Sequence, residues 1–417
     1  MSKYIIEGGN KLKGEVVLQG AKNSALPILA ATLLVKGQSL IHNCPNLSDV
    51  DAAIKILTAL GCKCSRTKND VYVDSTTVSC SEVPSELMSE MRSSVVFLGA
   101  ILARCSKSTV TAPGGCELGP RPIDLHLKAM EKLGFSVDET YGYIFCERVS
   151  NPENVSISLD FPSVGATENI ILASCVSKSR VIINNAAKEP EIVDLAGFIN
   201  KAGGRVVGAG THRVEIIGVD RLHSVEHSVI SDRIVAATYM SAVAANGGRL
   251  LLKNANVRHM DAVLNSFGEM GCDIKAEGEM LKIEANQPLH RIQTVRSMVY
   301  PGFPTDAGPL LVSALTLARG TSVFTENIFE NRFNYVSELR KLGADIKLFN
   351  KTAVIEGVSK LYGARVVCTD LRGGAAVVIA ALASEGRSIV EEIHHIERGY
   401  ENFDVVLRQM SANIVKE

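Results

Sequence analysis

The sequence predicts an α/β fold made of six repeats of about 70 residues, with three repeats in each of two closed domains. Three observations support this prediction: a helix end that recurs along the chain, a common order of elements, and a last repeat that lacks one strand. The first helix of every repeat is apolar on nearly all sides, which is typical of a buried helix. We therefore expect helices inside each domain and sheets outside.

A helix end followed directly by a strand recurs six times, as in TALGCKC and EKLGFSV. One small residue marks each end: Gly61, Gly134, Gly203, Gly271, Gly343 and Ser411. Neighbouring marks are 68 to 73 residues apart. Glycine is favoured just past a helix because it tolerates left-handed dihedral angles. The marks therefore define the repeat length.

Each repeat has the same order of elements. An apolar, Ala-rich helix comes first, followed by a short strand, a second helix and two strands around a polar turn, which predict a hairpin. The first strand of each repeat begins at or near Ser39, Thr109, Arg180, Arg249, Ser322 and Ser388. Pro27 is expected early in its helix, where a missing N–H matters least.

The last repeat ends one strand short, and the first residues of the chain supply a match. KYIIEGGNKLKGEVV aligns with TAVIEGVSKLYGARV at a constant offset of 349 residues. We expect the N-terminal strand to complete the last repeat, so that the repeats close on themselves rather than form an open solenoid. The expected domains are residues 21–229, and residues 1–20 together with 230–417.

Composition excludes several classes of protein. The 44 basic and 45 acidic residues give a net charge of −1, so nothing suggests a nucleic-acid or anionic-membrane partner. The start of the chain lacks an apolar signal region, and no apolar run reaches the length of a membrane span. We expect a cytoplasmic protein whose ten cysteines are reduced thiols.

Polar and basic residues recur where the buried helices begin. These are Lys22, Asn23, Arg92, Ser163, Val164, Gly165, Asp232, Arg233, Thr305, Asp306 and Arg372. Helix starts carry free N–H groups and partial positive charge, so added cations favour a small polyanion. If the domains face each other by these ends, a phosphorylated or carboxylated substrate is expected. Alternatively, Ser, Thr and Asp there are ordinary helix caps, and the cations need no explanation.

A Gly/Pro-rich loop, TVTAPGGCELGPRPIDLHL, interrupts the second repeat. Cys116 lies in this loop. A lone cysteine is often a small buried hydrophobic residue, but a Gly/Pro-rich loop is a poor place to bury one. Nearby Arg121 would favour the thiolate form of Cys116 and so its reactivity. Asp124 fits an ordinary acid in a first helical turn, and spacing assigns no role to His126. Weaker candidates are Cys62 with Cys64 and His394 with His395, neither of which has metal-site spacing. We expect no metal and no cofactor.

Several segments together resemble the UDP-N-acetylglucosamine 1-carboxyvinyltransferase (enolpyruvyl transferase) family over essentially the whole chain. They are GAKNSALPILAA at 20–31, PGGCELGPRPIDLH at 113–126, PSVGATENI at 162–170, GFPTDAGP at 302–309, FENRF at 329–333, DLRGGAA and HIERGYE. The resemblance implies an inside-out α/β barrel of two domains. It also implies transfer of the enolpyruvyl group of phosphoenolpyruvate to the 3′-hydroxyl of UDP-N-acetylglucosamine, with release of phosphate, in the first committed step of peptidoglycan synthesis.

Roles for individual residues follow from the same resemblance. Lys22, Arg121 and Arg398 would hold the phosphate, and Arg332 and Arg372 the carboxylate. Asp306 would accept the proton of the sugar hydroxyl, and Cys116 would donate a proton, form an adduct with phosphoenolpyruvate and be alkylated by fosfomycin. Sugar-nucleotide contacts are expected from Asn23, Arg92, Arg121, Pro122, Ile123, Asp124, Leu125, Ser163, Val164, Gly165, Thr305, Asp306, Ile328 and Asp370.

One departure and several alternatives remain. Some family members carry a lysine just before the Ser-Val-Gly stretch, where this chain has Phe161 and Pro162, so a charge contact to the UDP group there is in doubt. The nearest enzymatic alternative is a 5-enolpyruvylshikimate-3-phosphate synthase-like enzyme, against which the Cys116 loop argues. A non-catalytic UDP-sugar-binding protein or a silent repeat scaffold would also fit the repeats.

Overall fold

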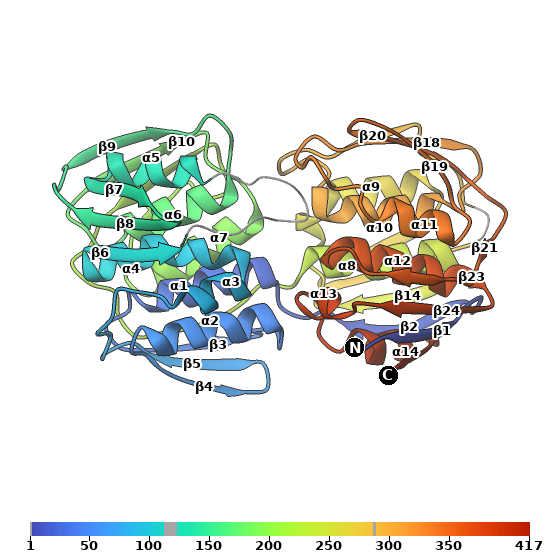
Figure 1. The fold of residues 1–417 in the computed structure, drawn as a ribbon, viewed down its shortest axis with the longest axis horizontal. Helices are drawn as coiled ribbons and strands as arrows, with labels where there is room; N and C mark the ends of the chain where they lie inside the picture. The colour runs from blue at the N-terminus through green and yellow to red at the C-terminus, as the bar shows by residue number, and fades with distance from the viewer. Residues whose placement is uncertain (1, 112–122, 287–288) are drawn as a thin grey trace. The chain divides into compact units, whose positions relative to one another are not determined.

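The computed structural model describes residues 2–111, 123–286 and 289–417, without the side chains of residues 89, 90, 92 and 93. The described chain forms two compact units (Figure 1). The middle unit comprises residues 20–111 and 123–230. The terminal unit comprises residues 2–19, 231–286 and 289–417.

The middle unit has apolar inner helices, more polar outer helices and three sheets. The inner helices are α1 (Lys22–Thr32), α4 (Phe97–Cys105), which follows the 3-10 turn η1 (Arg92–Val96), and α6 (Val164–Ser174). The outer helices are α2 (Ser48–Ala59), α3 (Ser85–Glu90), α5 (Asp124–Lys132) and α7 (Pro190–Lys201). The sheets, in spatial order, are β13 (Val225–Ser228), β3 (Gln38–His42), β5 (Asp70–Asp74) and β4 (Lys63–Thr67); β6 (Lys107–Thr111), β8 (Tyr143–Arg148) and β7 (Phe135–Thr140); and β11 (Val206–Val207), β12 (Arg213–Ile217), β10 (Arg180–Asn184) and β9 (Asn154–Ser158).

The terminal unit repeats this plan. Its inner helices are α8 (Arg233–Asn246), α10 (Gly308–Leu315), which follows the 3-10 turn η3 (Thr305–Ala307), and α12 (Leu371–Ala383). The outer elements are η2 (Val257–His259), α9 (Asp261–Glu269), α11 (Val336–Lys341), α13 (His394–Glu397) and α14 (Phe403–Gln409). The sheets are β22 (Arg365–Val367), β24 (Arg387–Glu391), β1 (Tyr4–Glu7) and β25 (Asn413–Lys416); β15 (Asp273–Glu277), β16 (Met280–Ala285), β14 (Gly248–Lys253) and β2 (Leu12–Val17); β17 (Thr294–Arg296), β18 (Thr321–Thr325), β20 (Thr352–Glu356) and β19 (Asp345–Phe349); and β21 (Leu361–Tyr362) with β23 (Ser384–Glu385).

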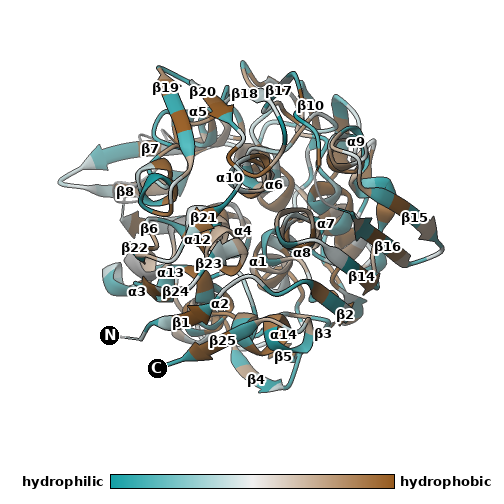
Figure 2. Ribbon diagram, turned by 90° about the vertical axis from the view of Figure 1, so that its right-hand side faces the viewer, coloured by the Kyte–Doolittle hydropathy of each residue, from teal (hydrophilic) through white to brown (hydrophobic). Residues whose placement is uncertain are grey.

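The inner helices are buried on all sides, as their sequences predict. In α12 every residue from Arg372 to Leu382 is buried, and α8 is buried from Ile234 to Ala245. Figure 2 shows the apolar helices α8, α10 and α12 of the terminal unit with strands around them. Such helices gain their stability from burial of apolar surface rather than from one amphipathic face. Within the described ranges, no helix combines the length and the apolarity that crossing a bilayer requires.

The N-terminal strand completes the last repeat, as the internal alignment predicts. Strand β1 pairs antiparallel with β25, with Tyr4 opposite Lys416, and also antiparallel with β24, with Tyr4 opposite Val390. Strand β2 lies parallel to β14. In Figure 1 the blue N-terminal strands therefore lie beside the red C-terminal ones. The last repeat is thereby complete, because β1 lies between β24 and β25 in their sheet.

The helix ends marked in the sequence have the expected backbone geometry. The five marking glycines have φ between +88° and +99°, and Ser411, in the sixth repeat, has φ of +70°. An L side chain is strained in this region, which explains the preference for glycine.

The expectation for Pro27 was wrong. It is the sixth residue of α1, so its missing N–H removes a helical hydrogen bond to Asn23.

A half-buried histidine links three strands of the middle unit, and its contacts predict a pH effect on stability. His42 on β3 contacts Asp70 (Nδ1 to Oδ1, 2.9 Å) and Glu226 (Nε2 to Oε1, 2.8 Å). The hydrogen bonds to Asp70 and Glu226 raise the pKa of His42 above its usual value of 6.5. A raised pKa in the folded state means that the added stability is complete below pH 6.5 and is lost as the pH rises through the folded-state pKa.

We therefore expect His42→Gln to lower the free energy of unfolding at pH 5.5 by up to about 1 kcal/mol, the range of exposed ion pairs, and to have less effect at pH 8.5. Urea denaturation at both pH values checks this. His212→Gln, an exposed histidine of the same unit, is the control. A loss that is larger at pH 8.5 would contradict the assignment.

Candidate active site

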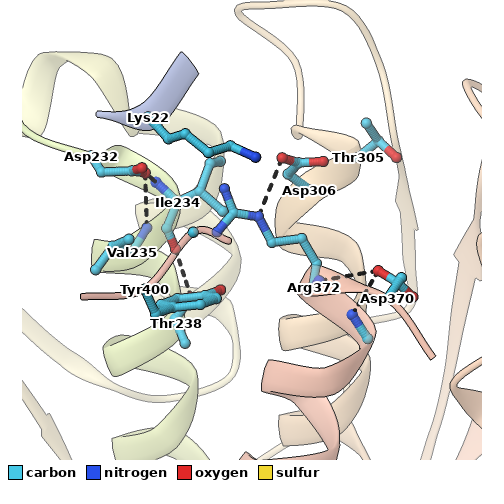
Figure 3. A network of polar contacts seen from close by, with 12 residues as sticks. Lys22, Asp232, Ile234, Val235, Thr238, Thr305, Asp306, Asp370, Arg372 and Tyr400 are labelled. Carbon is cyan, nitrogen blue, oxygen red and sulfur yellow. Dashed lines mark hydrogen bonds and ion pairs between the residues drawn. The ribbon is translucent and has the colours of Figure 1, made fainter. Parts of the chain in front are cut away.

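Two aspartates cap inner helices of the terminal unit. Asp232 Oδ1 accepts hydrogen bonds from the backbone N–H groups of Ile234 (2.8 Å) and Val235 (3.0 Å) at the start of α8 (Figure 3). Asp370 Oδ1 accepts from the N–H groups of Arg372 and Gly373, both at 3.0 Å, at the start of α12. Both carboxylates are therefore ordinary N-caps of their helices.

Asp306 lies in the turn η3 and is held by two buried arginines. Its Oδ2 is 3.3 Å from Nε of Arg372 (Figure 3). Its Oδ1 is 3.0 Å from Nη2 of Arg332. Arg332 is 1% exposed and Arg372 2% exposed, whereas the Asp306 side chain is 28% exposed. Two cations against one carboxylate leave a net positive charge beside an accessible acid. Such a group attracts a further anion.

The two guanidinium groups also have donors to spare. Nε of Arg332 and Nη1 of Arg372 are buried and find no acceptor among the described residues. Leaving a buried N–H unsatisfied is unfavourable by about 1–3 kcal/mol, and by more when the group is charged. Arginine is suited to oxyanions because its planar fork binds them bidentately. The arrangement thus favours a carboxylate or phosphate as ligand.

The ring of Tyr400 packs against the guanidinium group of Arg372. The guanidinium carbon of Arg372 lies 5.2 Å from the centre of the Tyr400 ring, and the Tyr400 hydroxyl is 2.8 Å from Oγ1 of Thr238 (Figure 3). Burial alone would lower the pKa of Arg372, but Tyr400 and Asp306 raise it, so the side chain stays charged. Burial raises the pKa of Tyr400, which stays neutral. Arg398 is the residue after α13 and stands two positions before Tyr400 in the sequence. Its side chain is half-buried.

Glu326 connects two predicted contact residues of the same unit. Thr305 donates through Oγ1 to Glu326 Oε2 at 2.9 Å, and the backbone N–H of Ile328 donates to Oε1 at 2.7 Å. Glu326 is 1% exposed, so this buried carboxylate sets where Thr305 and Ile328 lie. Sequence reasoning missed it, because no motif or helix start includes it.

In the middle unit Lys22 is the first residue of α1, and it pairs with an acid of α2. Its Nζ is 3.0 Å from Oδ2 of Asp49, and the two side chains are 11% and 3% exposed. A buried ammonium group requires such a partner. Sequence reasoning did not single out Asp49. Asn23, the next residue, is exposed.

The remaining predicted residues of the middle unit lie at two other helix starts. Ser163 caps α6 by accepting from the N–H of Ala166 at 3.3 Å, and half-buried Val164 and Gly165 follow. Ile123 precedes α5, which begins with the exposed Asp124 and the half-buried Leu125. Asp124 pairs with Lys128 at 3.5 Å, as an early-helix acid does. Phe161, which stands where some relatives have lysine, is exposed.

Several predicted residues fall outside what the structure describes. Cys116, Arg121 and Pro122 are in the undescribed stretch, and Arg92 begins η1 but its side chain is not described. No disulfide bond joins any two of the nine described cysteines. Among the described His, Cys, Asp and Glu side chains, no group of three is placed to hold a metal ion.

The chain matches the family described as EPSP synthase (3-phosphoshikimate 1-carboxyvinyltransferase) over residues 6–407. It resembles the crystal structure of the enolpyruvyl transferase NikO from Streptomyces tendae with a TM-score of 0.91 and 22% identity, covering 100% of this chain and 98% of that one. Fold and family match together define an enolpyruvyl transferase.

Relatives of higher sequence identity show which family of enolpyruvyl transferases the chain belongs to. The chain is 49% identical over 416 residues to UDP-N-acetylglucosamine 1-carboxyvinyltransferase 2 of Caldanaerobacter subterraneus subsp. tengcongensis, covering 100% of both. It is 44% identical over 417 residues to UDP-N-acetylglucosamine 1-carboxyvinyltransferase 1 of Symbiobacterium thermophilum, covering 99% of this chain and 94% of that protein. This chain belongs to the UDP-N-acetylglucosamine 1-carboxyvinyltransferase family.

Proposed function

We propose that this protein transfers the enolpyruvyl group of phosphoenolpyruvate to the 3′-hydroxyl of UDP-N-acetylglucosamine and releases phosphate, in the cytoplasm, as a step of peptidoglycan synthesis. The observation that carries the proposal is the accessible Asp306 carboxylate between the buried guanidinium groups of Arg332 and Arg372. This arrangement combines an oxyanion site with a group that can take a proton, and both are needed when a hydroxyl adds to phosphoenolpyruvate.

Each atom has a destination in the proposed reaction. The sugar hydroxyl oxygen attacks C2 of phosphoenolpyruvate and its proton passes to Asp306, while C3 receives a proton, which the family resemblance assigns to Cys116. The thiolate left on Cys116 then takes a proton back from C3 as phosphate leaves C2, which restores the double bond, and Asp306 passes its proton to the released phosphate. A hydroxyl is a weak acid, so positioning carries much of the work.

The arginines act on the carboxylate of phosphoenolpyruvate in this proposal. A bound carboxylate would compete with Asp306 for the N–H groups of Arg332 and Arg372, and binding would thereby free Asp306 to accept a proton. Family resemblance assigns Lys22, Arg121 and Arg398 to the phosphate. Asn23, Arg92, Ile123 to Leu125, Ser163 to Gly165, Thr305 and Ile328 would contact the sugar nucleotide.

Measuring phosphate release from phosphoenolpyruvate with different acceptors tests the proposal. We expect turnover with UDP-N-acetylglucosamine and none with shikimate-3-phosphate. The family match to EPSP synthase makes the second acceptor the relevant comparison. Turnover with shikimate-3-phosphate alone would overturn the assignment, and binding of the UDP sugar without turnover would identify a non-catalytic binding protein.

A thiol substitution gives a further prediction. We expect Cys116→Asp to retain part of the activity, because a carboxyl group can donate a proton, and to resist inactivation by fosfomycin, because the alkylated sulfur is gone. Cys146→Ser is the control, since burial raises the pKa of Cys146 to about 11 and keeps that thiol unreactive. Time courses of inactivation check this. Rapid inactivation of the Cys116→Asp protein would place the alkylation site elsewhere.

A further inference from the structure

A single side-chain amide joins three helical segments of the middle unit. Asn169 of α6 is fully buried, and its Oδ1 accepts from the backbone N–H of Gly99 in α4 at 2.7 Å. Its Nδ2 is 3.0 Å from the carbonyl oxygen of Val95 in η1 and 2.8 Å from Nδ1 of His126 in α5. All hydrogen-bonding groups of the amide are therefore engaged.

These contacts determine the protonation state of His126. The Gly99 N–H can only donate, so the amide oxygen must face it and both Nδ2 hydrogens must point to Val95 and His126. Nδ1 of His126 then has to accept, and the hydrogen of the neutral imidazole sits on Nε2. Burial lowers the pKa of His126 to about 4, although Asp124 acts in the opposite direction. The ring is thus neutral at pH 7.

The other edge of the same ring packs on the first turn of α6. A Cβ placed on Gly165 would lie 3.0 Å from Cε1 and 3.3 Å from Nε2 of His126. The imidazole thus fills the space that a side chain at position 165 would need. His126 itself lies two residues after Asp124, at the start of α5.

We propose that Asn169 and His126 form a positioning pair that sets the spacing of the three helix starts, those of η1, α5 and α6, that bind the sugar nucleotide. This inference rests on the proposed function, because those starts carry Arg92, Asp124 to Leu125 and Ser163 to Gly165. Neither side chain needs to touch the substrate. The pair acts through the backbone segments that it joins, so its loss changes affinity for the UDP sugar rather than the chemical step.

Steady-state kinetics of two His126 variants test the proposal. His126→Leu leaves an Asn169 N–H without an acceptor, and we expect KM for UDP-N-acetylglucosamine to rise roughly 10-fold while kcat and KM for phosphoenolpyruvate change little. His126→Gln keeps an acceptor and should recover much of the affinity. Asn200→Asp is the matched control, because this α7 amide also uses both ends, contacting the N–H and carbonyl of Val206, a residue that belongs to none of the three starts. Equal effects on both substrates, or no recovery with glutamine, would overturn the positioning role.

NMR of histidine side-chain nitrogens tests the pair without any substrate. We expect the Nε2–H tautomer of His126 to persist from pH 5 to pH 8 in the wild-type protein. In Asn169→Asp a carboxylate faces Nδ1, and His126 should become protonated in this range. An Nδ1–H tautomer, or titration of wild-type His126 between pH 5 and pH 8, would refute the pair even if the protein turns over its substrates. A wild-type protein that does not bind the UDP sugar would instead refute the proposed function. If His126→Leu does not fold, the glutamine variant and the wild-type spectra still decide.

Discussion

Asp306→Ala is expected to lower kcat by about 10²- to 10⁴-fold, the usual contribution of a positioned proton acceptor. Affinity for UDP-N-acetylglucosamine should change far less, because the proposal gives Asp306 its main role during attack of the hydroxyl. Rapid-quench or steady-state assays of phosphate release, together with calorimetric binding of the UDP sugar, measure the two effects separately. A large loss of binding with unchanged kcat would contradict the proposed role.

The alanine variant also removes the anion between two buried arginines, which can cost several kcal/mol of stability. Asp306→Asn is therefore the sharper variant, because the amide keeps the shape and one acceptor but cannot take the proton. Asp345→Asn, at the exposed start of β19, is the matched control in the same unit. Thermal unfolding of all three proteins shows whether the loss of activity follows a loss of fold.

The second large effect is expected for Arg372→Lys. Lysine keeps the charge but loses the planar fork, the contact of Nε with Asp306 and the position over the Tyr400 ring. Loss of a buried, charge-assisted contact to a ligand costs about 3 kcal/mol of binding, so kcat/KM for phosphoenolpyruvate should fall roughly 100-fold.

Initial rates at varied phosphoenolpyruvate concentration measure this effect. Arg365→Lys is the control, because the exposed Arg365 pairs with Glu391 at the surface. If the Arg372 and Arg365 variants lose activity equally, or if only KM for the UDP sugar changes, Arg372 does not hold the carboxylate of phosphoenolpyruvate.

Much of the fold could be predicted because the same local sequence preferences recur in each of the six repeats. A glycine with positive φ ends a helix wherever Gly61 or Gly343 stands, and an apolar helix has to be buried whatever its partners are. The pairing of β1 with β25 was also predictable, since the internal alignment shows which strand is missing. Pro27 shows the limit, because the position of a residue within a helix depends on where that helix begins.

Sequence reasoning names candidate site residues where they lie at helix starts, and it misses residues whose place depends on contacts between distant segments. Lys22, Ser163, Asp306 and Arg372 could be found because they recur at equivalent places in the repeats. Arg332 came only from family resemblance, since it lies in a loop outside the repeat pattern.

The partners of these residues were not foreseeable from spacing. Asp49 beside Lys22, Glu326 beside Thr305, and Asn169 against His126 are contacts between residues 21 to 43 positions apart. The sequence by itself determined the repeat, the buried helices and which residues begin them, because these follow from local backbone preference and apolar pattern. Only the tertiary structure decided which charges are neutralised and which donors stay unused, because hydrogen bonds and ion pairs depend on distances that packing alone sets.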